Sequence, residues 1–133
     1  MIYMLDTDTF SYLVKGVLPV QQAALKIDPD KIKVSVVTQA EAWFGLQIHS
    51  PGLQKQARIR ELFEGFEVLP LDTEVAATYA VIRAKLQKSG DLIGPNDLWI
   101  AAHALSKKMT LVTNNTREFK RVQGLKLENW VGV

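Results

Sequence analysis

Carboxylates recur at places where the sequence predicts buried structure. Asp6 and Asp8 directly follow the apolar stretch MIYML. Glu41 lies within SVVTQAEAWFGL, where helical spacing puts it on an apolar face, and Asp97 lies at the start of the apolar stretch DLWIAAHAL. An ionised carboxylate without a partner is costly in such surroundings, so each needs solvent, a basic group or a cation.

Each acid, taken alone, also has an ordinary structural interpretation. Pro95 suits the first position of a helix, so Asp97 would lie in the first turn, where the helix dipole favours an acid by roughly 0.3–1 kcal/mol. Glu41 could form an ion pair, or a capping box with Thr38, which precedes it at the S/T-x-x-E spacing. Both alternatives remain open for the single residues.

As a set, Asp6, Glu41 and Asp97 predict a metal site. No basic residue in the neighbouring motifs is placed to neutralise all three. Clustered carboxylates repel one another at low effective dielectric, and a divalent cation removes that repulsion. Oxygen ligands in a chain without cysteine favour Mg²⁺, with Mn²⁺ as the other choice. Such an ion would polarise phosphoryl oxygens and help to generate a hydroxide nucleophile.

The elements that must position these acids alternate along the chain. Apolar or β-branched runs predict strands at 1–5, 33–37, 66–70 and 110–113. Helical patterns occupy 9–16, 18–27, 38–49, 52–66, 73–90 and 95–108. Continuous apolar strands separated by helices predict an α/β fold with a parallel sheet covered on both faces. Ligands bind such sheets beyond the carboxyl ends of the strands, which is where Asp6 lies.

Composition limits the class of protein. A chain of 133 residues with 47% apolar content fits a single domain over 1–133. The net charge of +2 permits an anionic partner without requiring one. The absence of cysteine excludes disulfides and thiolate metal sites, and the sequence shows no export signal or membrane-spanning run. We therefore expect a soluble cytoplasmic protein.

Four stretches, in order, resemble the PIN-domain ribonucleases, specifically the VapC-type toxins of bacterial toxin–antitoxin pairs. They are MLDTDTFSYL, SVVTQAEAWFGL, GPNDLWIAAHAL and LVTNNTREFKRVQGLKLENW. The resemblance implies an α/β/α sandwich with a mainly parallel central sheet. It also implies a Mg²⁺-dependent endoribonuclease that cuts structured RNA, often tRNA in its anticodon region. The implied partners are a second copy of the chain and a cognate VapB-like antitoxin lying across an apolar groove.

The resemblance assigns the family's metal-site acids to Asp6, Glu41 and Asp97. The fourth acid of many PIN domains is missing, because asparagine occupies position 115 in the stretch TNN. Glu118 follows one helical turn later and is the expected substitute. Its alternative is an exposed glutamate beside basic neighbours.

Further residues flank these acids. Thr7 and Thr113 are expected to orient a carboxylate or a water, and Asn115 is a further candidate to support the acids. Asp8, where relatives usually carry asparagine, could bind an ion through water. The basic residues that could contact RNA phosphates are Lys107, Lys108, Arg117, Lys120 and Arg121. An ordinary solvated surface explains these basic residues equally well.

Two other functional classes are alternatives to a nuclease: a phosphatase and a binding module without catalytic activity. Asp6 and Asp8 resemble the start of the acidic motif of haloacid-dehalogenase-like phosphatases, with the first as nucleophile and the second as acid/base. The lysine and late paired acids of those enzymes are not evident, and Glu41 and Asp97 would have no role. A catalytically silent PIN-like binding module is the second alternative, although such a module has no need of clustered carboxylates.

Overall fold

A computed structural model describes residues 1–132. One sheet has the strand order β3-β2-β1-β4-β5, and every neighbouring pair is parallel. The strands are β1 (Tyr3–Leu5), β2 (Ile32–Ser35), β3 (Glu67–Leu69), β4 (Thr110–Val112) and β5 (Leu127–Glu128). The helices are α1 (Thr7–Lys15), α2 (Leu18–Leu25), α3 (Val36–His49), α4 (Leu53–Gly65), α5 (Thr73–Ser89), α6 (Pro95–Ser106) and α7 (Thr116–Phe119), with a 3-10 turn at Pro29–Lys31. The predicted α/β fold with a parallel sheet is confirmed.

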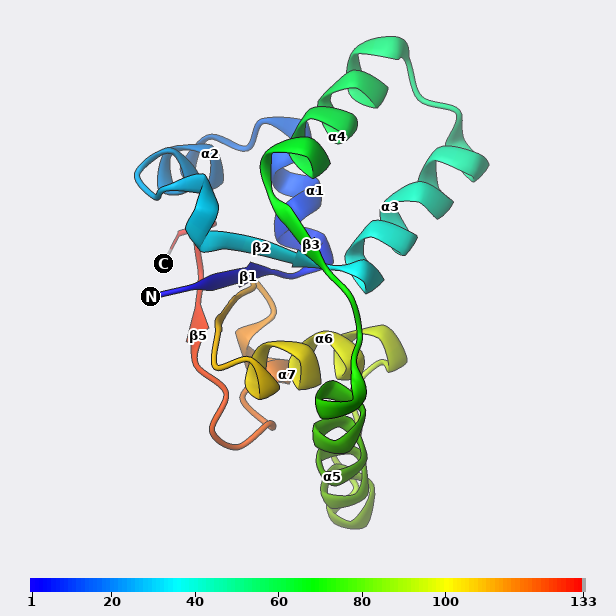
Figure 1. Cartoon of the computed structure of the whole chain (residues 1–133), viewed down its shortest axis with the longest axis vertical. Coiled ribbons are helices and arrows are strands. Elements are labelled where there is room, and N and C mark those ends of the chain that lie inside the picture. The colour runs from blue at the N-terminus through cyan, green and yellow to red at the C-terminus, as the bar shows by residue number, and fades with distance from the viewer. Residues whose placement is uncertain (133) are drawn as a thin grey trace.

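Helices cover both faces of this sheet. Figure 1 shows α1 to α4 on one side and α5 to α7 on the other. Successive strand residues point to opposite faces, so Met4 packs with the α5 and α6 side chains while Leu5 packs with those of α1 and α2. Each face thus has its own apolar core, and the predicted three-layer sandwich is confirmed.

The strand order reverses between β1 and β4. The chain runs outward from β1 through β2 to β3, then crosses back to place β4 on the other side of β1. At such a reversal the connections leave in opposite directions and open a crevice beyond the carboxyl ends of the strands. Asp6 directly follows β1 and Thr113 directly follows β4, so both lie at this crevice.

The start of α3 differs from the prediction. Ser35 ends β2, and its side-chain oxygen accepts a hydrogen bond from the Val37 N–H at 3.1 Å, so the helix begins at Val36. Capping by Ser35 outweighs the strand preference of the two valines. Thr38 is therefore inside the helix, and the alternative of a capping box between Thr38 and Glu41 is excluded.

The sheet edges also differ from the prediction. The strands were expected to be buried on both faces, but edge strand β3 exposes Glu67 and only partly buries Val68 and Leu69. Strand β5 was not predicted, because two residues carry no measurable periodicity. Two helix ends follow local signals as expected: Gly16 ends α1 with a left-handed φ of 73°, and Pro95 opens α6. Helix α1 begins at Thr7, two residues before the predicted start, because Asp6 caps it.

Helix α6 is buried along most of its length, as its apolar sequence predicts. Across residues 1–132, no helix combines the length and the apolar character needed to span a membrane. Val133, the last residue of the predicted domain, lies outside the described residues.

Candidate active site

Asp6 is held in place by the backbone at the end of β1. Its Oδ1 accepts a hydrogen bond from the Thr9 N–H at 2.8 Å, which makes Asp6 the N-cap of α1. Its own N–H donates to the Val112 carbonyl at 3.0 Å, and the Thr9 hydroxyl donates to the same carbonyl at 3.1 Å. Only 3% of Asp6 is exposed. This carboxylate therefore has one fixed position between β1 and β4.

Burial and hydrogen bonding act against each other on the pKa of Asp6. Burial raises this pKa, whereas hydrogen bonds from the Thr113 side chain and from Thr9 lower it. The neighbouring carboxylate of Asp8 raises it further, and the resulting pKa lies above the ordinary value. Thr113 and Thr9 thus both favour the ionised form of Asp6.

The pKa of Asp97 responds to the charges of the other acids. It occupies the first turn of α6 and is partly buried. Burial raises its pKa to about 6, and the negative charges of Glu118, Asp6, Glu41 and Asp8 contribute in that order. Five carboxylates from distant parts of the sequence therefore share one electrostatic environment.

Glu41 is oriented by hydroxyl groups from two helices. The Thr7 hydroxyl donates to Glu41 Oε1 at 2.7 Å, and the hydroxyl oxygens of Thr7 and Thr38 are 3.2 Å apart. Thr38 is fully buried, and its contact with Thr7 was not predicted, because it joins residues 31 positions apart. Its spacing of three residues before Glu41 on one helix was the available signal.

The surroundings of Glu41 are more open than the sequence predicts. Phe44 and Ile48, which share its helical face, are 64% and 57% exposed. The apolar face of α3 therefore does not point into the core at this end. Instead, Glu41 lies at the boundary between the acids and an apolar groove.

That groove separates α1 from the hairpin of α3 and α4. We call it the α1–α3–α4 groove, and its lining includes Phe10, Val14, Ala42, Leu46 and Ile59, with Thr7 and Glu41 at its polar boundary. Because Thr7 and Glu41 belong both to the groove and to the acid cluster, the two features are continuous.

Glu118 connects α7 to the start of α6. Its Oε1 accepts from the N–H of Gly94, the N-cap residue of α6, at 3.1 Å, and its Oε2 accepts from Asn115 Nδ2. The Asn115 N–H in turn donates to Thr113 Oγ1 at 2.9 Å. The amide at position 115 thus orients the nearby glutamate, and Glu118 lies at the same end of α6 as Asp97.

No basic side chain forms an ion pair with the acids in the part of the chain that the structure describes. None of its ion pairs involves Asp6, Asp8, Glu41, Asp97 or Glu118. Within residues 1–132, the acidic and histidine side chains also do not converge tightly enough to enclose an ion. The shared electrostatic effect on Asp97 shows that the acids are neighbours, so an ion would have to draw them closer. An all-oxygen donor set without a counter-charge fits Mg²⁺ or Mn²⁺.

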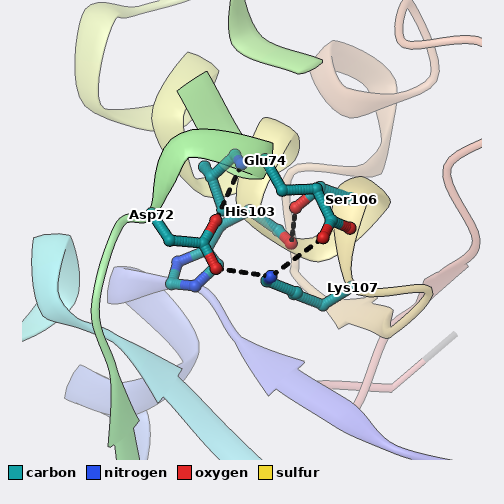
Figure 2. A network of polar contacts seen from close by, with 6 residues as sticks. Asp72, Glu74, His103, Ser106 and Lys107 are labelled. Carbon is teal, nitrogen blue, oxygen red and sulfur yellow. Dashed lines mark hydrogen bonds and ion pairs between the residues drawn. The ribbon is translucent and has the colours of Figure 1, made fainter. Parts of the chain in front are cut away.

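The structure does not bring Lys107 and Lys108 to the acids. Lys107 follows Asp97 by about ten residues, or roughly 15 Å along the helix axis. Its Nζ lies 2.6 Å from Asp72 Oδ2 and 3.5 Å from Glu74 Oε2. Figure 2 draws both ion pairs as dashed lines. Lys108 follows directly, with a left-handed φ of 57°. Both therefore lie at the far end of α6, where Lys107 is already paired.

The other three basic candidates stay near Glu118. Arg117 belongs to the same short helix, and Lys120 is exposed just after it. Arg121 donates from its NH1 to the Leu92 carbonyl at 3.1 Å, in the loop that precedes α6. All three therefore lie on α7 or within two residues of its end, and Glu118 belongs to the same helix.

Comparisons with known proteins agree with this arrangement. A family model described as PIN domain matches residues 3–125. The chain is similar to "Ribonuclease VapC2" of Haemophilus influenzae, with 38% identity over 129 residues, covering 97% of this chain and 98% of that protein. It is 32% identical over 128 residues to "tRNA(fMet)-specific endonuclease VapC" of Salmonella typhimurium, covering 96% and 97%. The crystal structure of VapBC2 from Rickettsia felis bound to a DNA fragment from its promoter superposes with a TM-score of 0.89 and 32% identity, covering 98% and 99%.

Proposed function

Because this chain belongs to the PIN-domain family, we propose that it is a metal-dependent endoribonuclease, the toxin of a toxin–antitoxin pair. The observation that carries this proposal is the group of carboxylates at the reversal of the strand order, none of which forms an ion pair within residues 1–132. We assign the whole of 1–133 to one domain. We place it in the cytoplasm, where its RNA substrate would be found.

Four acids would hold the ion, which we propose to be Mg²⁺, with Mn²⁺ as a substitute. Asp6 and Asp97 would bind it directly, and Glu41 and Glu118 would complete the site. When bound, the ion supplies a Lewis acid that polarises the phosphodiester and makes water more acidic. We expect hydrolysis to leave a 5′-phosphate and a 3′-hydroxyl.

The protein's own contribution is to hold these acids still. Asp6 is fixed as a helix cap, and Thr7 fixes Glu41 by donating to one of its oxygens. Gly94 and Asn115 fix Glu118 in the same way. Donors arranged in advance reduce the cost of ordering the carboxylates when substrate and ion bind.

The substrate we propose is structured RNA, with tRNA cut in its anticodon region as the leading candidate. The Salmonella relative is named a tRNA(fMet)-specific endonuclease. Arg117, Lys120 and Arg121 would contact phosphates on the α7 side of the acids. Such contacts provide affinity and orientation but little sequence selection.

The partner we propose is a VapB-like antitoxin. The similar Rickettsia felis structure is that of a VapBC2 complex. The α1–α3–α4 groove is apolar and ends at Thr7 and Glu41, so a peptide segment lying in it would cover the acids. Inhibition would then follow from occlusion of the site. A homodimer is the second assembly that we propose.

The family membership favours the nuclease over the phosphatase. In the phosphatase interpretation, Asp6 and Asp8 would act as a nucleophile and acid/base pair. Asp6 is buried and already caps α1, whereas Asp8 is exposed. Glu41 and Glu118 would also be held by specific hydrogen bonds for no chemical purpose.

The deciding experiment is cleavage of a total tRNA pool by the antitoxin-free protein, with Mg²⁺, with Mn²⁺ and with EDTA. Asp97→Asn is tested beside it, and Asp72→Asn is the matched control because it neutralises an acid at the far end of α6. We expect discrete fragments that require metal, vanish in Asp97→Asn and persist in Asp72→Asn. Equal cleavage by Asp97→Asn would overturn the assignment of the site, and release of phosphate from small phosphate esters without RNA cleavage would favour the phosphatase. Absence of cleavage together with normal antitoxin binding would favour the silent binding module.

A further inference from the structure

His103 is a polar side chain buried on the face of the sheet that α5 and α6 cover. It lies on α6, is fully buried, and comes roughly one and two-thirds turns after Asp97. Its ring Nδ1 is 2.8 Å from Ser35 Oγ. Its Nε2 has no hydrogen-bond partner within residues 1–132. Figure 2 shows the ring beside the Asp72 and Lys107 side chains.

The contact between His103 and Ser35 is compatible with either ring tautomer, and the other partner of Ser35 favours one direction. Ser35 Oγ already accepts from the Val37 N–H, so its own hydrogen is available to donate to Nδ1. Burial lowers the pKa of His103, and the positive charge of Lys107 lowers it further. A neutral imidazole with its proton on Nε2 matches these contacts, and Ser35 would then be the donor to Nδ1.

This bond joins two of the helices that carry site acids. Ser35 caps α3, which carries Glu41, whereas His103 belongs to α6, which carries Asp97. The first turn of α3 is further held by Val37, which packs in the same apolar core as the α6 side chains. The His103–Ser35 bond is thus the polar contact at the place where α3 leaves the sheet.

We propose that His103 is a positioning residue, which fixes the first turn of α3 through Ser35 and so holds Glu41 in place relative to Asp97. An imidazole with an unmatched ring nitrogen is a poor core residue, because a buried polar atom without a partner is costly. A leucine would fill the same layer without that cost. What leucine cannot supply is the bond to Ser35.

An effect of His103 on metal affinity rests on the proposed function, whereas its effect on the first turn of α3 can be tested without metal. The first test is therefore amide hydrogen exchange by NMR on the intact protein in EDTA, comparing the parent with His103→Leu and His103→Asn. The asparagine oxygen can take the place of Nδ1. In His103→Leu we expect the amides of residues 37–41 to exchange about 10-fold faster, with α5 unchanged, and in His103→Asn to stay within about 3-fold of the parent.

A spectroscopic signature accompanies this test. Imidazole nitrogen shifts of the parent should show the proton of His103 on Nε2. Unchanged exchange at residues 37–41 in His103→Leu, or acceleration spread equally over α5, would overturn the proposal.

The second test is the affinity for Mn²⁺ by titration calorimetry. We expect His103→Leu to bind Mn²⁺ about 10-fold more weakly while its melting temperature stays the same or rises, and His103→Asn to match the parent. A fall in melting temperature with unchanged Mn²⁺ affinity would reduce His103 to a packing residue. If the parent itself binds no Mn²⁺ while the exchange responds as expected, the proposed metal-dependent function fails and the positioning of α3 by His103 stands.

Discussion

The charged side chains at the two ends of α6 differ in whether they form ion pairs. At its first turn, Asp97 lies among four other carboxylates, and its pKa rises to about 6. At its other end, Lys107 lies between Asp72 and Glu74, and hydrogen bonding between Lys107 and Asp72 lowers the pKa of the carboxyl and raises that of the amine. Paired charges hold two helices together, whereas unpaired like charges oppose folding. The presence of unpaired acids at one end supports our proposal that the active site lies there.

The largest expected effect is that of Asp97→Asn on catalysis. We expect RNA cleavage to fall by about 1000-fold or more, because the substitution removes a proposed metal ligand. The metal-free protein should become more stable by about 1 kcal/mol at pH 7, since a raised pKa means that the folded state disfavours the ionised acid and solvent screens part of the effect. Single-turnover cleavage and urea unfolding in EDTA measure the two changes.

Asp72→Asn is the matched control at the other end. It should keep its cleavage rate and lose a little stability, because it breaks the pair with Lys107. A loss of stability in both variants would show that the two ends do not differ as their charges indicate.

An added divalent ion should stabilise the protein only through the acids at the Asp97 end of α6. A saturating divalent ion, at about 100 times its dissociation constant, stabilises a protein by about 2.7 kcal/mol. For a domain of this size we expect the melting temperature to rise by about 5–10 °C in the parent and in Asp72→Asn. Asp97→Asn should show little shift. A shift of full size in Asp97→Asn would place the ion elsewhere.

The two ends of α6 should respond differently to pH, because the pKa of Asp97 is raised and that of Asp72 is lowered. The raised pKa of Asp97 contributes stability that is fully present below its ordinary value of 3.8 and is lost as the pH rises through about 6. The metal-free protein should therefore gain about 1 kcal/mol from pH 7 to pH 5, with Asp6 acting in the same direction. Over the same range Mn²⁺ affinity should fall, because protons compete for Asp97.

The contribution of Asp72 to stability should not change between pH 7 and pH 5. The lowered pKa of Asp72 contributes stability above its ordinary value, and this is lost only as the pH falls below 3.8. Urea unfolding of Asp97→Asn and Asp72→Asn between pH 7 and pH 5 separates the two. A gain of the same size in Asp97→Asn as in the parent would assign the effect to other groups.

The smallest expected effect is that of Lys107→Met. Exposed ion pairs contribute little, so the melting temperature should fall by about 2 °C or less, and less still in high salt. Cleavage of tRNA should stay within about 2-fold of the parent. A large loss of cleavage with unchanged stability would return Lys107 to the RNA-binding role that the sequence suggested.

The sequence predicts the parts of the site that depend on neighbouring residues. Asp6 follows an apolar run and Pro95 precedes Asp97 by two positions, so a strand end and a helix start could both be read locally. The alternation of strands and helices then predicts the parallel sheet, which brings the ends of β1 and β4 together.

The missed features depend on contacts between distant residues or on competition between local signals. Lys107 pairs with Asp72, which lies 35 positions away, and no periodicity announces that contact. At the start of α3, the capping oxygen of Ser35 overrides the β-branched residues that follow it. In the sequence, His103 is one polar residue in an apolar helix. Its contact with Ser35 depends on the fold, because the two residues lie 68 positions apart.

Asp6 has consequences for how this toxin can be inactivated by mutation. Its carboxylate is both a proposed metal ligand and the cap of α1, so most replacements would also remove a cap, at a cost of about 0.5–2 kcal/mol. Asp97 caps nothing, and its loss should relieve repulsion. Cells that survive the loss of the antitoxin should therefore accumulate well-folded, abundant toxin altered at Asp97, which can still sequester antitoxin, whereas changes at Asp6 should tend to lower the amount of protein.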